Sequence, residues 1–435
     1  MTFDRSIMEA VEQLGYRVTV GDVATKAGLN VNLAEKGLLT LASGAGGHLQ
    51  VAESGDIVYL FPQNFRDIIR NKDLQLRLRE WWEKIWRVLF YLIRISFGIL
   101  LIVSILLIFI SIFIIITATN SSKDNNNRNN SGGGLFFLAR LVDISDLWWI
   151  FYWDYDRPYG RRQYAITSEN QMNFLEAVYS FLFGDGNPNQ DLDDRRWKNI
   201  ATVIRNNKGA VVAEQIAPYL DSIGSGYTQE YEEYMLPVLI RFNGRPEVSP
   251  DGDIVYHFPD LQTTAQQQNI QSVSSYLREK RWRFSEATSG QIIAAAGLGG
   301  VNFIGALVLK SLLADGTIAA KLGGLVAFVN SIFWLLFGYG TAFLAVPLIR
   351  YFWIQWQNQK IEARNSDREK LANILSSPNP ELQKKIAYTQ QFAAEAIIGN
   401  DNLAYTTEKD LITQEIEQSD KIDAAWQLRL NQSDS

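Results

Sequence analysis

The chain has 435 residues, a formal net charge of −6 at pH 7, two histidines and no cysteine. A chain without cysteine forms no disulfide and offers no thiolate to zinc or to an iron–sulfur cluster, and two histidines cannot build a multi-histidine metal centre. The acidic balance argues against a general nucleic-acid binder. We therefore expect no metal, no cofactor and no enzyme activity.

Residues 1–64 are predicted to form a winged-helix-like module. Apolar periodicity predicts a helix over 3–15, a second helix capped by Thr19 and stopped by Gly28, and a third over 31–43. Strands at 48–53 and 56–62 are predicted to form a hairpin around Ser54 and Gly55. The expected apolar set of the third helix is Leu33, Leu38, Leu39 and Leu41.

The charge of this module bears on what it binds. Binding of DNA through the third helix needs lysine and arginine to neutralise phosphates. Residues 1–64 contain four basic and seven acidic side chains, and the third helix offers one lysine, Lys36, beside Glu35. The sequence therefore favours a protein-contact module over a nucleic-acid reader.

Residues 65–94 are predicted to be a basic juxtamembrane helix that leads into a transmembrane helix over 95–118, which carries no charge. A cleaved signal peptide is the competing interpretation, but signals lie within the first ~15–30 residues. Basic residues mixed with tryptophan before a span are typical of a cytoplasmic or stromal membrane surface. The predicted membrane-surface residues are Arg77, Arg79, Trp81, Trp82, Lys84, Trp86 and Arg87.

Residues 119–134 are predicted to be a flexible Asn/Gly linker, because they contain too few apolar residues to pack a core. Residues 135–165 are aromatic and long enough to span. Their charges (Arg140, Asp143 and Asp146) make a crossing costly, so we expect them to lie in the membrane interface or to be re-entrant.

An internal repeat is the most specific signal. Residues 51–62 read VAESGDIVYLFP and residues 248–259 read VSPDGDIVYHFP, which are identical at eight of twelve positions. We therefore expect a second winged-helix-like module over 166–262, with its first helix at 195–209, Pro237 kinking its third helix, and His257 on an edge strand. The predicted turn and packing residues of the two wings are Gly55, Asp56, Tyr59, Phe61, Gly252, Asp253, Tyr256 and Phe258.

A basic connector (263–289) leads to a predicted transmembrane hairpin over 290–354, with spans at 291–309 and 322–349. The glycine-rich piece of the first span indicates close helix packing, since no strand precedes it as in a phosphate loop. Basic residues place both ends of the hairpin and the basic juxtamembrane helix (65–94) on one side of the membrane. Three crossings cannot satisfy this arrangement. Either 134–153 also crosses, or 88–119 is re-entrant, or the charge rule fails for one segment.

Residues 355–435 are predicted to form a helical tail with helices at 359–377, 380–398 and 406–430, interrupted by Pro378 and Pro380 and with Thr406 or Thr407 as the last cap. The amphipathic faces suit docking on the modules or on a partner, or packing of the tail on itself.

The fold class expected from these patterns is an α+β membrane protein with two winged-helix-like modules, transmembrane helices and a helical tail. The two GDIVY-x-FP wings (Gly55–Pro62 and Gly252–Pro259), the stretch Asn402–Leu411 and the order of the spans resemble an uncharacterised family of integral membrane proteins of cyanobacteria and plastids. That resemblance implies a photosynthetic membrane, the thylakoid or a cyanobacterial plasma membrane, and brings no catalytic residues. Plant members carry a loose label of iron–sulfur cluster biosynthesis, which a chain without cysteine does not support chemically.

Three functions follow as hypotheses. The leading one is a membrane-anchored scaffold or assembly factor that contacts membrane lipids and binds protein partners, for example subunits of a photosynthetic membrane complex. A membrane-tethered transcription regulator is the alternative, but it needs a basic recognition face that neither copy has. An enzyme or transporter would need a catalytic constellation or converging polar groups in the spans. The oligomeric state stays open.

Overall fold

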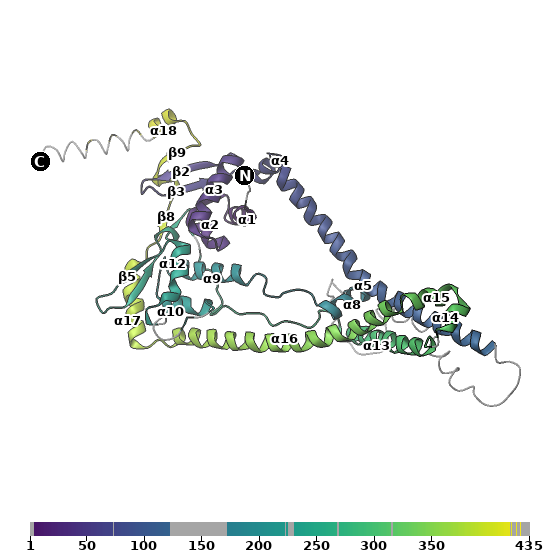
Figure 1. Cartoon of the computed structure of the whole chain (residues 1–435). Helices are drawn as coiled ribbons and strands as arrows, with labels where there is room; N and C mark the ends of the chain where they lie inside the picture. Colours follow the sequence, from purple (N-terminus) through teal and green to yellow (C-terminus); the bar gives the residue numbers. More distant parts are fainter. Residues whose placement is uncertain are drawn as a thin grey trace, which may run out of the picture. The chain divides into compact units, whose positions relative to one another are not determined.

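The computed structural model describes residues 4–121 and 172–417, except 73, 222, 225–229, 268 and 315, together with residues 419, 423 and 427. Helices dominate this part of the chain and small sheets lie among them (Figure 1). The chain divides into two compact units. The first unit comprises Met1–Arg79, Pro188–Lys280 and Lys360–Ser435, and the second comprises Glu80–Asn187 and Arg281–Gln359.

The amino-terminal part of the first unit has the predicted order of elements, with one strand added. The helices α1 (Arg5–Gln13), α2 (Val20–Ala27) and α3 (Val31–Ala45) precede the hairpin of β2 (His48–Ala52) and β3 (Ile57–Leu60), and β1 (Arg17–Thr19) pairs with β3. Thr19 and Asp22 form a capping box at the start of α2. Gly28 ends α2 with φ of 68°, as predicted.

Two side chains of α3 do not lie where they were predicted. Leu33 is 60% exposed and Leu39 is 43% exposed, whereas Leu38 and Leu41 are buried. The buried stripe of α3 is completed by small residues at helical spacing (Val31, Ala34, Ala42 and Ala45). The prediction chose leucines by size, and the helical period excludes two of them from the core.

The second copy repeats this order. It consists of α9 (Leu192–Asn206), β4 (Ala210–Val211), α10 (Ala213–Ile216), the 3₁₀ turns η1 (Ala217–Tyr219) and η2 (Glu233–Met235), α12 (Leu236–Phe242), β5 (Arg245–Val248) and β6 (Ile254–His257). Pro237 lies in the first turn of α12, where its missing N–H costs nothing, so the predicted kink is wrong. His257 is also corrected, because β6 is the central strand of the order β4-β6-β5.

The backbones of the two predicted copies correspond at several positions. Before the first strand of each copy, two successive residues adopt positive φ: Gly15 and Tyr16 in one copy, Lys208 and Gly209 in the other. The strand registers also correspond, since Arg17 lies opposite Leu60 and Ala210 lies opposite His257. The two copies therefore share one backbone plan and not only a similar wing sequence.

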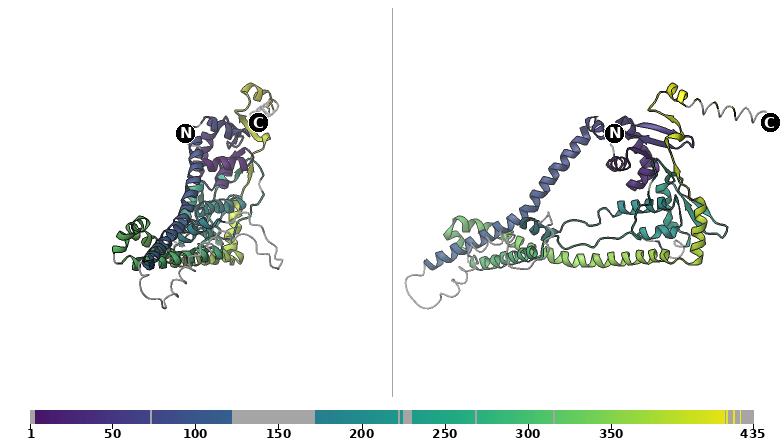
Figure 2. Two further views of the ribbon diagram at one scale, coloured as in Figure 1. Left: turned by 90° about the vertical axis from the view of Figure 1, so that its right-hand side faces the viewer. Right: turned by 180° about the vertical axis from the view of Figure 1, so that it is seen from behind.

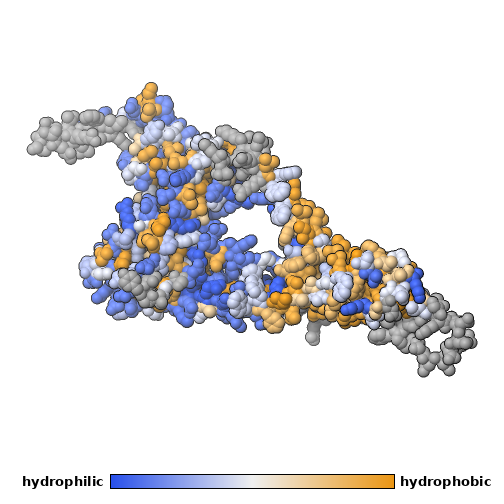
Figure 3. Space-filling view, viewed as in Figure 1, coloured by the Kyte–Doolittle hydropathy of each residue, from blue (hydrophilic) through white to orange (hydrophobic). Residues whose placement is uncertain are grey.

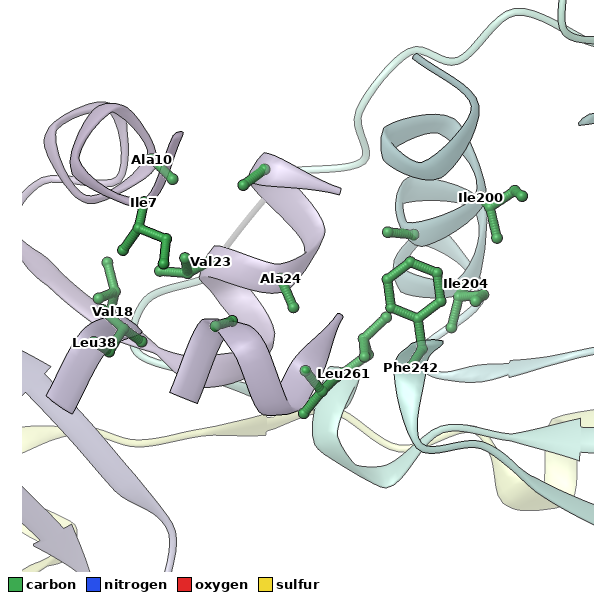
Figure 4. Packing of buried hydrophobic residues seen from close by; sticks show 14 of the residues in the cluster. Ile7, Ala10, Val18, Val23, Ala24, Leu38, Ile200, Ile204, Phe242 and Leu261 are labelled. Atoms are coloured by element: carbon green, nitrogen blue, oxygen red, sulfur yellow. The ribbon is translucent and has the colours of Figure 1, made fainter. Parts of the chain in front are cut away.

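The two copies share one hydrophobic core. Apolar side chains of α1, α2 and α3 and those of α9, α12 and η3 (Pro259–Leu261) belong to a single buried cluster (Figure 4). Helix α2 lies close to this second copy because Gly21 has no side chain: a Cβ there would be 2.0 Å from the carbonyl oxygen of Asp260. The part of the second predicted module that lies in the first unit, from Pro188 onward, thus folds against the first module.

The carboxy-terminal tail docks on both copies. Leu382 of α17 (Pro380–Thr389) packs with Val212 and Val255 of the second copy. Strand β8 (Ala396–Ile397) pairs with β7 (Thr263–Thr264), and β9 (Leu403–Thr406) pairs with β2, beside which it lies in all views (Figures 1 and 2). Docking of the tail on the modules is therefore the alternative that the structure selects.

Several predicted tail helices need correction. The helix expected over 380–398 ends at Thr389, continues in the turn η4 (Gln390–Phe392), and gives way to strand β8. Thr406 is in a strand after the turn η5 (Asn400–Asn402) and caps nothing; α18 (Leu411–Glu417) starts after Asp410, whose side chain accepts from the N–H of Ile412. These short strands form by pairing with strands that are distant in sequence. Local periodicity carries no information about such partners.

The second unit contains long apolar helices. The described residues hold three helices long and apolar enough to cross a membrane: Trp81–Thr119, Ser289–Leu312 and Phe333–Ser376. They belong to α5 (Leu74–Ser121), α13 (Ser289–Leu312) and α16 (Phe333–Ser376), and α4 (Phe65–Lys72) precedes α5. Hydrophobic surface gathers over this unit (Figure 3). The predicted span over 322–349 is corrected, because α14 (Thr317–Leu322) and α15 (Gly324–Ser331) are separate short helices before α16.

Packing inside the second unit gives the direction of each helix. One layer joins Leu101 and Ile105 of α5 with Ala295 of α13, Phe343 of α16 and α8 (Phe174–Phe183). The other layer joins Ile112 and Ile115 of α5 with Leu309 of α13, Phe333 of α16 and α14 and α15. Helices α5 and α13 therefore run parallel and α16 runs antiparallel to them. Helix α8 belongs to this unit, although the prediction assigned residues from 166 onward to the second module.

Candidate interaction surfaces and the ion pairs behind them

The predicted wing residues occupy matching places in the two copies. Gly55 and Gly252 both have φ of 88° in their turns, where a side chain would be strained. The carbonyl of Asp56 accepts from the N–H of Ala52 and that of Asp253 accepts from Ser249, which closes each hairpin. The aromatic side chains that follow (Tyr59, Phe61, Tyr256 and Phe258) are all buried.

The two wing tyrosines differ in their surroundings. Burial, with the nearby carboxylate of Glu35, raises the pKa of Tyr59 to about 12. Burial also raises the pKa of Tyr256, whose hydroxyl donates to Glu232 at 2.8 Å. Both phenols therefore stay neutral at physiological pH, so neither is an acid–base group there.

The predicted membrane-surface residues lie on α5. Trp81, Trp82 and Trp86 are 61%, 60% and 52% exposed, and Lys84 and Arg87 are also exposed. The side chains of Arg77 and Arg79 lie outside the described residues, although the backbone of both is part of α5. The exposed tryptophans and cations precede the apolar part of the helix, as in an interfacial belt. The predicted linker from residue 122 and the aromatic segment at 135–165 lie outside the described residues.

The outer faces of α3 and α12 expose apolar side chains. Leu236 and Ile240 of α12 are 57% and 65% exposed, and Leu33 and Leu39 project from α3. Arg241 is the basic residue of α12. Its Nε and Nη2 donate to the carbonyl of Gly28 at 3.0 and 2.7 Å, and its guanidinium lies 4.4 Å from the ring centre of Trp197. The Arg241 guanidinium therefore makes its contacts within the protein and does not face a ligand.

A buried ion-pair network holds the carboxy-terminal turns of α16 in the first unit. Arg368 is 2% exposed and donates to the carbonyls of Leu220 and Leu277, to Glu279 at 2.8 Å and to Asp221 at 2.9 Å. Arg364 also donates to Glu279. Burial alone would raise the pKa of Glu279, but its hydrogen bonds and ion pairs with Arg364 and Arg368 lower it.

A second buried cation holds α17. The Lys385 ammonium donates to Glu214 at 3.1 Å and to Glu232 at 2.7 Å. Burial would lower the pKa of Lys385, but these two carboxylates raise it, so the lysine stays charged. The same Glu232 accepts from the hydroxyl of Tyr256, which links the tail helix to the second wing.

A third ion pair joins the two copies. Asp22 is 3% exposed; it accepts from Arg205 at 2.5 Å, from the N–H of Thr19 at 3.0 Å and from the N–H of Ala265 at 3.0 Å. Sequence reasoning missed all three networks. Asp22, Arg368 and Lys385 stand among other charged residues of amphipathic helices, and burial alone distinguishes them.

No metal centre is visible in the part of the chain that the structure describes, where no group of three or more His, Asp or Glu side chains is placed to hold an ion. His257 is half-buried and its Nε2 lies 3.0 Å from the side-chain oxygen of Gln262. His48, in β2, lies opposite Leu60.

The described residues thus define a helix-rich protein with small sheets and three apolar helices long enough to span a membrane. "Uncharacterized protein At5g03900, chloroplastic" from Arabidopsis thaliana is 37% identical to this chain over 422 residues, which cover 94% of this chain and 80% of the relative. The chain belongs to the family of this chloroplast protein. No family model matches it, and no solved structure matches it.

Proposed function

We propose that the protein is a membrane-anchored scaffold or assembly factor whose two modules bind protein partners at the stromal or cytoplasmic face of a photosynthetic membrane. The order of helices and the three-stranded core of each sheet support a winged-helix-like classification of both modules. The chloroplast relative supports a plastid-type membrane. Three long apolar helices support membrane anchoring.

The observation that carries this proposal is the character of the outer faces of α3 and α12. In a winged helix that reads DNA, this face supplies cations to phosphates and polar groups to base edges. Here α12 exposes Leu236, Pro237 and Ile240, and α3 exposes one cation, Lys36, beside Glu35. Exposed apolar side chains mark a protein-contact surface more often than a nucleic-acid surface. A membrane-tethered transcription regulator is therefore the second candidate, supported only by the winged-helix-like order of helices and strands.

The compactness of the first unit supports a location of all its segments on the same side of the membrane. Its first two segments share a buried core and the third packs on both, so the chain must cross the membrane an even number of times between Arg79 and Pro188 and again between Lys280 and Lys360. Helices α13 and α16 supply the second pair of crossings. Helix α5 supplies one crossing of the first pair, and residues 122–171 lie outside the described part of the chain.

Contacts at one end of the second unit support this path. Arg94, which precedes the apolar part of α5, pairs with Asp185 at 3.0 Å, and Asp185 accepts from the N–H of Glu286 just before α13. Arg350 of α16 donates to the carbonyl of Phe181 at 2.9 Å. The start of the apolar part of α5, the amino end of α13 and Arg350 of α16 therefore lie together within the second unit.

Co-purification tests the scaffold function. We expect a tagged copy, extracted from native membranes in mild detergent, to retain subunits of one membrane complex in high salt, because apolar contacts are not screened. Nucleic acid that is lost as salt rises would instead establish the regulator, since phosphate contacts depend steeply on salt. Isolation of the protein without any protein partner would contradict the scaffold proposal.

A further inference from the structure

We call the exposed apolar side chains of α3 and α12 the apolar ridge (Leu33, Leu39, Leu236 and Ile240). The side-chain amide of Asn30, the cap of α3, donates to the carbonyl of Ile240 at 3.2 Å. The amino end of α3 therefore lies beside the carboxy end of α12. The ridge is thus continued from one module to the other.

The ridge follows the internal repeat. Residues 46 and 243 both close their helices in the left-handed region, so the third helices align with the offset of 197 that relates the wings. In this alignment Leu38 and Met235 are both buried, while Leu39 and Leu236 are both exposed. Each copy therefore presents a leucine at the same outer position of its third helix, which no contact within the described first unit covers.

The rim of the ridge is acidic. Glu35 on α3, Glu233 before α12, and Asp193 and Asp194 on α9 are exposed. Asp193 and Asp194 are close enough to Arg241, the neighbour of Ile240, to act on its charge, although burial lowers the pKa of Arg241 overall. The exposed cations of α3, α9 and α12 are Lys36 and Lys198, and Asp193 also pairs with Arg196 at 2.8 Å. An apolar strip with a carboxylate rim is complementary to an apolar strip with a cationic rim.

We propose that the apolar ridge binds a basic amphipathic helix of a protein partner. This inference rests on the proposed scaffold function and specifies the chemistry of the partner that the scaffold binds. The partner's apolar side chains, spaced three or four residues apart, pack across Leu236, Ile240 and Leu33, and its lysines and arginines meet the acidic rim. An anionic membrane surface and DNA are both repelled by this rim. A second copy of this chain would bring two acidic rims together.

Site-specific cross-linking in native membranes tests the ridge. A benzophenone amino acid replaces Ile240 or Leu236 in the full chain, and Ile270, which is 84% exposed and outside the ridge, is the control position. We expect both ridge positions to cross-link to one protein, at a peptide rich in lysine or arginine with apolar residues at helical spacing. The control position is expected to yield at least tenfold less of that product.

A charge reversal tests the acidic rim. The double variant Glu35→Lys with Glu233→Lys is expected to reduce the cross-link at Ile240 at least tenfold, because it places cations against the partner's cations. The matched control reverses two exposed carboxylates of the tail, Glu381→Lys with Glu395→Lys, and is expected to leave the yield within twofold. Cross-links to lipid, to nucleic acid, to a second copy, to other residues of this chain or to an acidic peptide would overturn the inference.

These experiments distinguish a failure of this inference from a failure of the proposed scaffold function. If a partner co-purifies in high salt but the ridge positions cross-link to nothing, the ridge is not its binding site and the scaffold function stands. If no protein co-purifies and none is cross-linked, both proposals fail.

Discussion

Replacing Arg368 with methionine is expected to destabilise the first unit by about 3–5 kcal/mol, the cost of breaking a buried ion pair by removing one partner. The variant leaves two carbonyls without their donor and removes one of the two guanidinium groups that neutralise Glu279, itself 5% exposed. Urea unfolding followed by pulse proteolysis in detergent measures the loss. The matched control is Lys370→Met on the same helix, whose ion pair with Asp367 is exposed and contributes little.

The Arg368 variant also changes how stability depends on pH. The pKa of Glu279 is lower in the folded protein than its ordinary value of 4.5, so its contribution is present above pH 4.5 and is lost as the pH falls below it. Without Arg368 this pKa rises toward its ordinary value, and less stability remains to be lost in acid. An equal acid dependence in the variant and the natural chain would contradict the assigned role of Arg368.

The substitution Asp22→Asn is expected to separate the two copies, at a cost of about 3–5 kcal/mol. It leaves Arg205 without its buried counter-charge and turns an amide toward the N–H groups of Thr19 and Ala265. Urea unfolding and protease access to the junction between α2 and α9 measure the effect.

The matched control is Asp4→Asn at the exposed cap of α1, where asparagine caps as well as aspartate, and no measurable loss is expected. Equal stability of the two variants would show that the Asp22 pair does not hold the copies together.

The elements that the sequence predicted are those with local signals. The GDIVY wings, the Thr19 cap and the stop at Gly28 each depend on residues within one turn or hairpin, and all appear as expected. The repeat was visible because glycine and aspartate are required at the same turn positions in both copies.

The parts that could not be predicted depend on contacts between distant segments. Strand β9 forms only because β2 offers it an edge, more than three hundred residues away in the chain. In β3, Ile57 is 37% exposed, while Val58 is buried against Ala265 and Ile398 from distant parts of the chain. The apolar ridge was missed for a different reason, since Leu33 and Leu39 were assigned to the apolar set of α3 as large leucines although the helical period places them outside the core.

The central claim is that three separate stretches of the chain form one unit on one side of a membrane, and cysteine labelling tests it most directly. Because the natural chain has no cysteine, single cysteines at Ser43, Asp251 and Lys384 can be probed with an impermeant maleimide in sealed vesicles. We predict that all three react from the same side, and that a cysteine at Thr317 reacts only from the other. Labelling of Ser43 and Asp251 from opposite sides would contradict the account.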